Sequence, residues 1–226
     1  RLLDGWGIPP NRALAVADAE RAASGQSNVT AKLFLSSLYL SGRAPDKLAL
    51  VLKLESESLD HVIKLADAGN VDAQLVLGLR VLPRRNYPGD LTKAVRRLGA
   101  AANQNHPIAQ HRLGQLHLQG RGVKKNPAMA ARWFAAAARQ GHSEALRYLG
   151  IMYLQGNGVW RNPAEAVRLT DASALLGNIQ ARYGMARMHA QGVVVPKNKI
   201  EACKWFLLIA PKNPAAKKHV VRMNEE

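Results

Sequence analysis

The chain has 226 residues, enough for one or two domains with a substantial core. It carries 32 Lys and Arg against 16 Asp and Glu, and it is 47% apolar but only 5% aromatic. No stretch approaches the length of about 18 uncharged apolar residues that a transmembrane helix needs, so none is predicted. Cys203 is the single cysteine, which excludes an intrachain disulfide.

The formal net charge of +16 is unevenly distributed along the chain. Residues 1–72 carry 8 basic and 9 acidic side chains, whereas residues 73–226 carry 24 basic and 7 acidic ones. No acidic residue occurs between positions 91 and 143. This asymmetry favours an acidic partner for the C-terminal two-thirds, and the alternative is a surface that only keeps the chain in solution.

A period of 36 residues organises the sequence, and several residue types stay in phase with it. The positions in phase are Gly78, Gly114 and Gly150; Ala73, Ala109, Ala145 and Ala181; Gly120, Gly156 and Gly192; and Val123, Val159 and Val195. A single two-helix repeat cannot bury its apolar face alone, whereas stacked copies bury it against one another. The sequence therefore predicts a stack of similar helical repeats.

In chain order, a partial repeat comes first, because DGWGIPPN near the start matches the later loop QGRGVKKN. We therefore expect the chain to begin inside a repeat and the intact protein to extend upstream. The predicted repeats of a single domain over residues 1–226 are 1–28 (partial), 29–72 (with an insertion), 73–108, 109–144, 145–180 and 181–212, followed by a C-terminal capping helix at 213–226.

Each full repeat is predicted to hold two helices joined by a glycine loop. The pairs Asn126-Pro127 and Asn162-Pro163 combine an N-cap acceptor with proline at the first helical position, so a helix begins there. Residues that tolerate the left-handed conformation at a helix end follow in phase. They are Gly69, Asn105, Gly141, Gly177 and Asn213.

The other helix of the repeat is predicted from about residue 143 to residue 155, with Ala145, Leu149 and Met152 on one face. Gly114 and Gly150 lie inside such helices, although glycine there costs about 1 kcal/mol relative to alanine. Their position predicts that the backbone of a neighbouring helix approaches closely.

The repeat pattern resembles that of a known family. LHLQGRGVKKNPAMAARWF from Leu116 and MYLQGNGVWRNPAEAVRLT from Met152 are similar to the Sel-one-like repeat family, a relative of tetratricopeptide repeats. The resemblance implies an all-α fold, a right-handed α-solenoid of stacked two-helix repeats. It also implies a non-enzymatic adaptor or scaffold that binds proteins, and it transfers no catalytic residue. Family members are common in bacterial envelopes, so we expect the bacterial periplasm or cell envelope.

The resemblance places the first helix of each repeat on the concave face. Positions two, three and six residues after the phase alanine are predicted to be partly exposed there. The candidate partner-binding residues are His111, Arg112, Gln115, Arg147, Tyr148, Tyr183 and Arg187. Arginine interleaved with tyrosine is typical of binding surfaces. The alternative for Tyr148 and Tyr183 is a place in the core.

Two further surfaces are candidates. Trp160 lies in a loop, where it either packs on the adjacent loop or forms an exposed anchor for a partner or a sugar ring. An alternative basic surface is predicted at Lys124, Lys125, Arg132 and Arg139.

No catalytic or metal-binding motif is visible. His111 and His117 are six residues apart and so face different ways on a helix, and neither H-E-x-x-H nor C-x-x-C occurs. We therefore predict no metal, no cofactor and no enzymatic activity. The leading hypothesis is a scaffold that binds an acidic protein partner. The alternative is a binder of an anionic polymer, with exopolysaccharide favoured over nucleic acid because no nucleic-acid motif is present.

Overall fold

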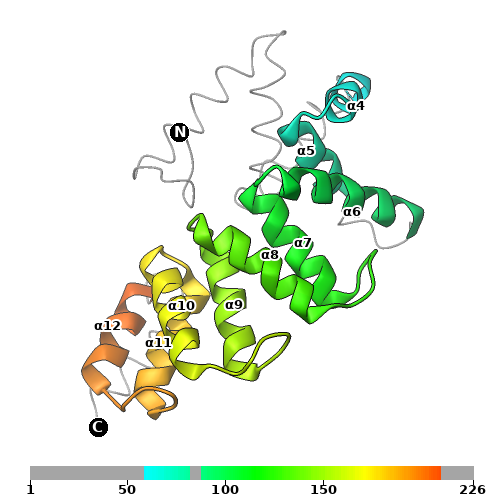
Figure 1. Ribbon diagram of the computed structural model, residues 1–226. Helices are drawn as coiled ribbons and strands as arrows, with labels where there is room; N and C mark the ends of the chain where they lie inside the picture. The colour runs from blue at the N-terminus through cyan, green and yellow to red at the C-terminus, as the bar shows by residue number, and fades with distance from the viewer. Residues whose placement is uncertain (1–58, 82–87, 210–226) are drawn as a thin grey trace, which may run out of the picture. The chain divides into compact units, whose positions relative to one another are not determined.

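The computed structural model describes residues 59–81 and 88–209 (Figure 1). Within these ranges there are nine helices and no strand. The helices are α4 (Leu59–Asp67), α5 (Val71–Val81), α6 (Pro88–Asn103), α7 (Pro107–Gln119), α8 (Pro127–Arg139), α9 (Ser143–Gln155), α10 (Pro163–Leu175), α11 (Ile179–Gln191) and α12 (Lys199–Ile209). The predicted partial repeat 1–28, most of the repeat 29–72 with its insertion, Asn213 and the capping helix lie outside the described residues.

The chain divides into two compact units, residues 1–140 and 141–226, which we call the N-terminal and the C-terminal body. In the N-terminal body α4 packs on α5, α5 on α6, α6 on α7 and α7 on α8. Its main core contains Leu75, Leu98, Ile108, Leu113 and Leu116, and the ring of Trp133 packs partly buried against this cluster. The two-helix repeat therefore buries its apolar residues against its neighbours, as the 36-residue period predicted.

The C-terminal body contains α9 to α12, and successive helices again pack against one another. Its core clusters centre on Met185 and on Phe206, both almost completely buried. Trp205 packs against both clusters and joins them.

The predicted starts of the second helices are confirmed. The Asn126 side-chain oxygen accepts a hydrogen bond from the backbone N–H of Met129 at 3.0 Å, and that of Asn162 accepts one from Glu165 at 3.1 Å. Proline follows each cap in the first turn. These bonds satisfy backbone donors that a helix start leaves unpaired, so the local sequence is enough to begin the helix.

The first helices carry N-caps that the sequence analysis did not identify. His106 and His142 occupy this position, and their Nδ1 atoms accept from the backbone N–H of Ala109 and Ala145 at 3.4 and 3.2 Å. Asn178 does the same for α11. The three caps are spaced by one period of 36 residues. Histidine is an uncommon N-cap, so its capping role could not be predicted from its residue type.

The predicted helix ends are also confirmed where they are described. Asn105 and Gly141 have φ angles of 65° and 74°, the left-handed conformation that closes a helix. Val194 takes φ 71° at a place where the two preceding repeats have glycine. A β-branched residue is disfavoured in this region, so this loop keeps the conformation of the two preceding loops, where Gly122 and Gly158 have φ angles of 70° and 74°, against its local preference.

The two glycines inside the first helices are explained differently. A Cβ atom on Gly150 would lie 2.9 Å from Thr170 Oγ1 and 3.2 Å from the backbone oxygen of Ala166, so α10 does approach closely. On Gly114 a Cβ atom would lie 2.7 Å from the ring of Phe134. The predicted backbone approach is therefore wrong for Gly114, where a buried side chain fills the space.

Candidate protein-binding groove

A groove runs between α9 and α11 in the C-terminal body. Its volume is about 220 Å³, and its lining residues come from one stripe of each of these helices, with one residue from α10. They are Arg147, Gly150, Ile151, Leu154, Thr170, Gln180, Ala181, Gly184 and Met188. Arg147 and Gln180 lie near the starts of α9 and α11, and Leu154 and Met188 lie about two turns later on the same helices. Since both pairs line one groove, α9 and α11 lie side by side and run in the same direction.

The floor of the groove is formed by small residues and is largely apolar. Gly150 and Gly184 add no side chain, and Ala181 adds one methyl group. The Thr170 hydroxyl donates to the backbone oxygen of Ala166 at 2.7 Å, so its hydrogen is already used within α10. Ile151 stands exposed at the wall. The arrangement suits an apolar side chain of a partner.

Arg147 is the cation of the groove, and a network fixes its position. Its Nε and Nη2 atoms donate to one carboxylate oxygen of Glu144 at 3.1 and 2.9 Å, and its guanidinium carbon lies 4.3 Å from the Tyr148 ring centroid. The Asn178 amide donates to the other oxygen of Glu144. Glu144 thus joins the start of α9 to the cap of α11 and holds Arg147 at the groove.

Of the predicted partner-binding residues in this body, only Arg147 lines the groove. Tyr148 is partly buried beside it. Tyr183 packs at 5.8 Å, edge to face, on Phe206, which favours the core alternative for this tyrosine. Arg187 is exposed on α11 but is absent from the lining. The predicted residues therefore do not form one cluster.

In the N-terminal body the expected exposure of His111 is wrong. Its side chain is 5% exposed, and its ring lies 5.8 Å from that of Phe134. The missing side chain at Gly114 lets Phe134 reach α7 and cover this face. Arg112 and Gln115 are partly exposed as expected, and the Arg112 Nη1 donates to the Gln115 side-chain oxygen at 3.0 Å.

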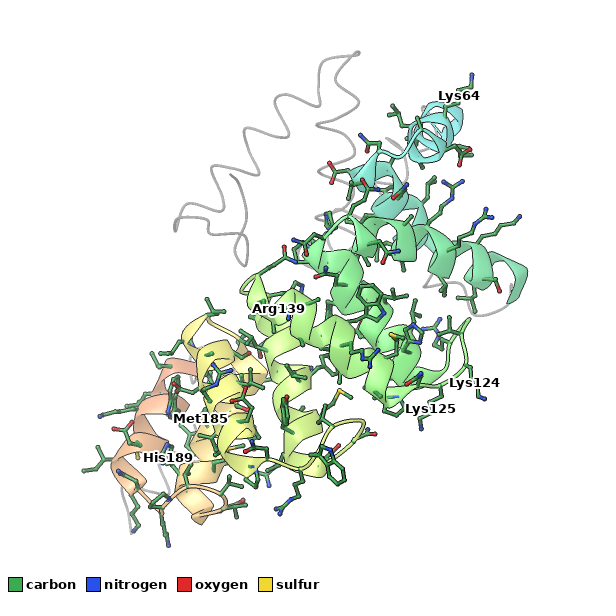
Figure 2. All side chains as sticks on the ribbon, in the orientation of Figure 1. Lys64, Lys124, Lys125, Arg139, Met185 and His189 are labelled. Atoms are coloured by element: carbon green, nitrogen blue, oxygen red, sulfur yellow. The ribbon has the colours of Figure 1, made fainter. Side chains whose placement is uncertain are left out.

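Trp160 is 95% exposed, so of its two alternatives the loop-packing one is wrong. The residues of the alternative basic surface, Lys124, Lys125, Arg132 and Arg139, are all exposed as well. Figure 2 shows Lys124 and Lys125 at the loop between α7 and α8, away from Arg139 at the end of α8. The four cations are therefore distributed along the repeat and do not form one tight cluster.

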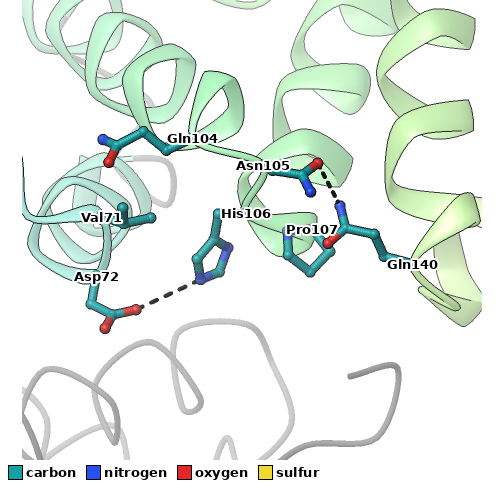
Figure 3. Close-up of a pocket in the computed structure, with 7 residues that line it drawn as sticks. All are labelled: Val71, Asp72, Gln104, Asn105, His106, Pro107 and Gln140. Atoms are coloured by element: carbon teal, nitrogen blue, oxygen red, sulfur yellow. Dashed lines mark hydrogen bonds and ion pairs between the residues drawn. The ribbon is translucent and has the colours of Figure 1, made fainter. Parts of the chain in front are cut away.

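A second cavity, of about 530 Å³, lies in the N-terminal body beside the turn between α6 and α7 (Figure 3). Its lining residues are Val71, Asp72, Gln104, Asn105, His106, Pro107 and Gln140. Side-chain amides bond one repeat to the next here, since Gln104 donates to Gln74 at 3.0 Å and Gln140 to Gln110 at 2.8 Å. Sequence reasoning missed this ladder, although both pairs keep the 36-residue period.

Residues 59–81 and 88–209 hold no group of three or more His, Cys, Asp or Glu side chains placed to bind a metal ion. No helix within these ranges is both long enough and apolar enough to cross a membrane.

The model of the Sel1 repeat matches residues 1–27, 107–142, 143–178 and 179–210, more than half of the chain. The chain belongs to the Sel1 repeat family. The predicted all-α solenoid fold is thereby confirmed. Sel1 repeats are typically non-catalytic units that mediate protein–protein interaction. No curated protein sequence matches the chain.

Solved structures of Sel1 proteins resemble the chain. One is a protective antigen present in uropathogenic Escherichia coli strains, which displays an SLR fold: it is 26% identical, with a TM-score of 0.71, and the match covers 92% of this chain but 43% of that protein. The chain thus spans less than half of that relative. A Sel1 repeat protein from Oxalobacter formigenes is 23% identical with a TM-score of 0.66, over 76% of this chain and 72% of the other. This second likeness concerns the fold alone.

Proposed function

We propose that this Sel1 repeat protein is a scaffold whose C-terminal body binds an acidic segment of a partner protein in the groove between α9 and α11. The observation that carries the proposal is an apolar floor with a positioned arginine beside it. Such a groove takes one apolar side chain of the partner, and Arg147 pairs with a carboxylate close to that side chain.

In this proposal, most of the binding free energy comes from burying an apolar side chain of the partner against the floor of the groove. Full burial of a leucine or methionine side chain of the partner is worth about 1.5–3 kcal/mol. The two glycines and Ala181 are fixed in packed helices, so little ordering is needed on the scaffold side when the partner binds. The partner segment must be narrow, because the cavity has a volume of only about 220 Å³.

The charge of the body supports an acidic partner. Residues 141–209 carry 8 basic and 4 acidic side chains. Three of those acids are paired with a cation on their own helix: Glu144 with Arg147, Glu165 with Arg168 and Glu201 with Lys204. A positive surface attracts and orients an acidic segment, and mismatched cationic partners are repelled.

The test is to select binders for the full chain from a library of short random peptides and to measure their affinity for variants. We expect the selected peptides to share an apolar residue next to Asp or Glu. Arg147→Gln should weaken their binding by roughly thirtyfold, the effect of losing an interface anchor. Arg168→Gln is the matched control, because it breaks the same kind of ion pair on α10, away from the groove. Equal affinity of both variants would refute the proposal.

A second candidate function is the binding of an anionic polymer, favoured by the exposure of Lys124, Lys125, Arg132 and Arg139 in a stretch without acidic residues. Dextran sulfate added to the same measurement distinguishes the two. If it competes with the peptides and Arg147→Gln has no effect, the polymer becomes the better proposal. The E. coli relative is a protective antigen, which supports the cell envelope as the location in either case.

A further inference from the structure

We propose that the C-terminal body also docks on an anionic lipid surface, through the loop between α9 and α10, the loop between α11 and α12, and the first turn of α12. The proposal concerns a different surface from the groove and does not depend on it. We call this surface the loop edge and define it by three apolar and three cationic residues. They are Trp160, Val193, Ile200, Arg161, Lys197 and Lys199.

The two loops leave the body at the same end. Leu154 and Met188 line the groove together near the last turns of α9 and α11, and these helices run in the same direction. The chain then turns at Gly156 and Gly192, which close the two helices with φ angles of 71° and 69°. Figure 1 shows both loops on one side of this body. Their residues therefore contribute to one surface.

Equivalent backbone hydrogen bonds hold the loop between α9 and α10 and the loop between α11 and α12. The backbone N–H of Asn162 donates to the oxygen of Tyr153 at 2.9 Å, and that of Asn198 donates to the oxygen of His189 at the same distance. The Arg161 Nε also donates to the oxygen of Leu154 at 3.2 Å. Because the loop backbones are already fixed, little conformational entropy is lost when their side chains meet a surface.

The apolar side chains of the loop edge are unusually exposed. The exposed fractions are 95% for Trp160, 71% for Ile200 and 53% for Val193. An indole ring is apolar with one polar N–H group, which suits the boundary between lipid headgroups and acyl chains.

The charge of the loop edge is positive. Arg161, Lys197 and Lys199 have no acidic partner among the described residues. The acids nearest along the chain, Glu165 and Glu201, are each held at 2.6 Å by a cation of their own helix, Arg168 and Lys204. Each cation close to an anionic membrane strengthens binding by about fivefold. Exposed apolar tips between cations are complementary to anionic lipid.

A protein partner is the competing occupant. Protein hot spots are typically buried in pockets at the centre of an interface, with a matching anchor opposite. The loop edge instead presents its tryptophan on a loop, with Val193 on the neighbouring loop and Ile200 in the first turn of α12. A lipid surface accepts such exposed side chains without a shaped counterpart, so the geometry favours lipid.

The experiment is sedimentation of the full chain with vesicles of phosphatidylcholine alone, or of equal parts phosphatidylcholine and phosphatidylglycerol. We expect binding to the anionic vesicles only, weakened at least about tenfold by Trp160→Ala. Leu207→Ala is the matched control, because Leu207 is 56% exposed on α12 outside the loop edge, and it should change binding less than twofold. Lys197→Gln with Lys199→Gln should weaken binding by roughly 25-fold.

Fluorescence then tests contact directly. Brominated phosphatidylglycerol should quench the bound wild type, and Trp160→Phe should bind but lose that quenching although three other tryptophans remain. Equal binding of Trp160→Ala and Leu207→Ala, equal binding to both vesicle types, or quenching that persists in Trp160→Phe would each overturn the proposal. Loss of peptide binding in Trp160→Ala without any change in vesicle binding would assign the loop edge to a protein partner instead.

Discussion

Two glycines in helix interiors give a direct test of how the repeats pack. At Gly99 in α6, apart from its chain neighbours and the backbone of its own helix, no atom lies within 4 Å of the position that a Cβ atom would take. At Gly114 in α7 the same atom would lie 2.7 and 2.8 Å from Cε1 and Cδ1 of Phe134, whose side chain is fully buried. Alanine is thus free of contacts at one site and overlaps a fixed ring at the other.

The expected magnitudes follow from these contacts. Alanine favours a helix interior over glycine by about 1 kcal/mol, so Gly99→Ala should stabilise the protein by about that amount. Gly114→Ala gains the same term but overpacks the core, which costs about 1–3 kcal/mol. The difference between the two variants in free energy of unfolding isolates the steric cost. We expect it to be about 1–3 kcal/mol, with Gly114→Ala the less stable.

Urea denaturation followed by circular dichroism measures the free energy of unfolding of both variants. Each kcal/mol of that free energy corresponds to a shift of about 2–4 °C in melting temperature. Phe134→Leu provides the coupling test, because it removes the ring atoms that the new methyl group would meet. Gly114→Ala should therefore cost less in the Phe134→Leu background than in the wild type. If Gly114→Ala stabilised the protein as much as Gly99→Ala, Phe134 would not fill the space at Gly114 and our account of the repeat would be refuted.

Two further predictions concern histidines. His142→Ala should lower the free energy of unfolding by about 1 kcal/mol in urea titrations, because it removes the N-cap of α9, and His142→Asn should retain stability, since Asn178 caps α11 in the same way; equal losses would contradict the capping role. Burial lowers the pKa of His117 below its ordinary value of 6.5, against an opposing hydrogen bond to the Lys124 backbone. The unfolded chain therefore takes up this proton first as pH falls through about 6.5, and stability decreases below that pH until the folded state is protonated too. His117→Gln should flatten the melting temperature between about pH 7 and pH 5 relative to wild type, and an unchanged slope would show that His117 does not contribute.

Much of the secondary structure could be predicted from the sequence because its determinants are local. Asn126 and Asn162 cap α8 and α10 through bonds to residues three positions later. Asn105 and Gly141 end helices through their own backbone conformation. Repetition at 36 residues then makes one correct assignment valid for several copies. The family and its fold class follow from the same pattern.

Which side chains share a surface was decided only by the tertiary structure. Arg147 and Arg187 were grouped by their offsets, yet only Arg147 lines the groove, because α9 and α11 turn different stripes toward each other. His111 was expected at the surface and is covered by Phe134, a residue 23 positions away in the next helix. The exposure of Trp160 was left open by the sequence for the same reason. A period sets how often a position recurs, whereas burial depends on the rotation of each helix about its axis and on the volume of the side chains opposite.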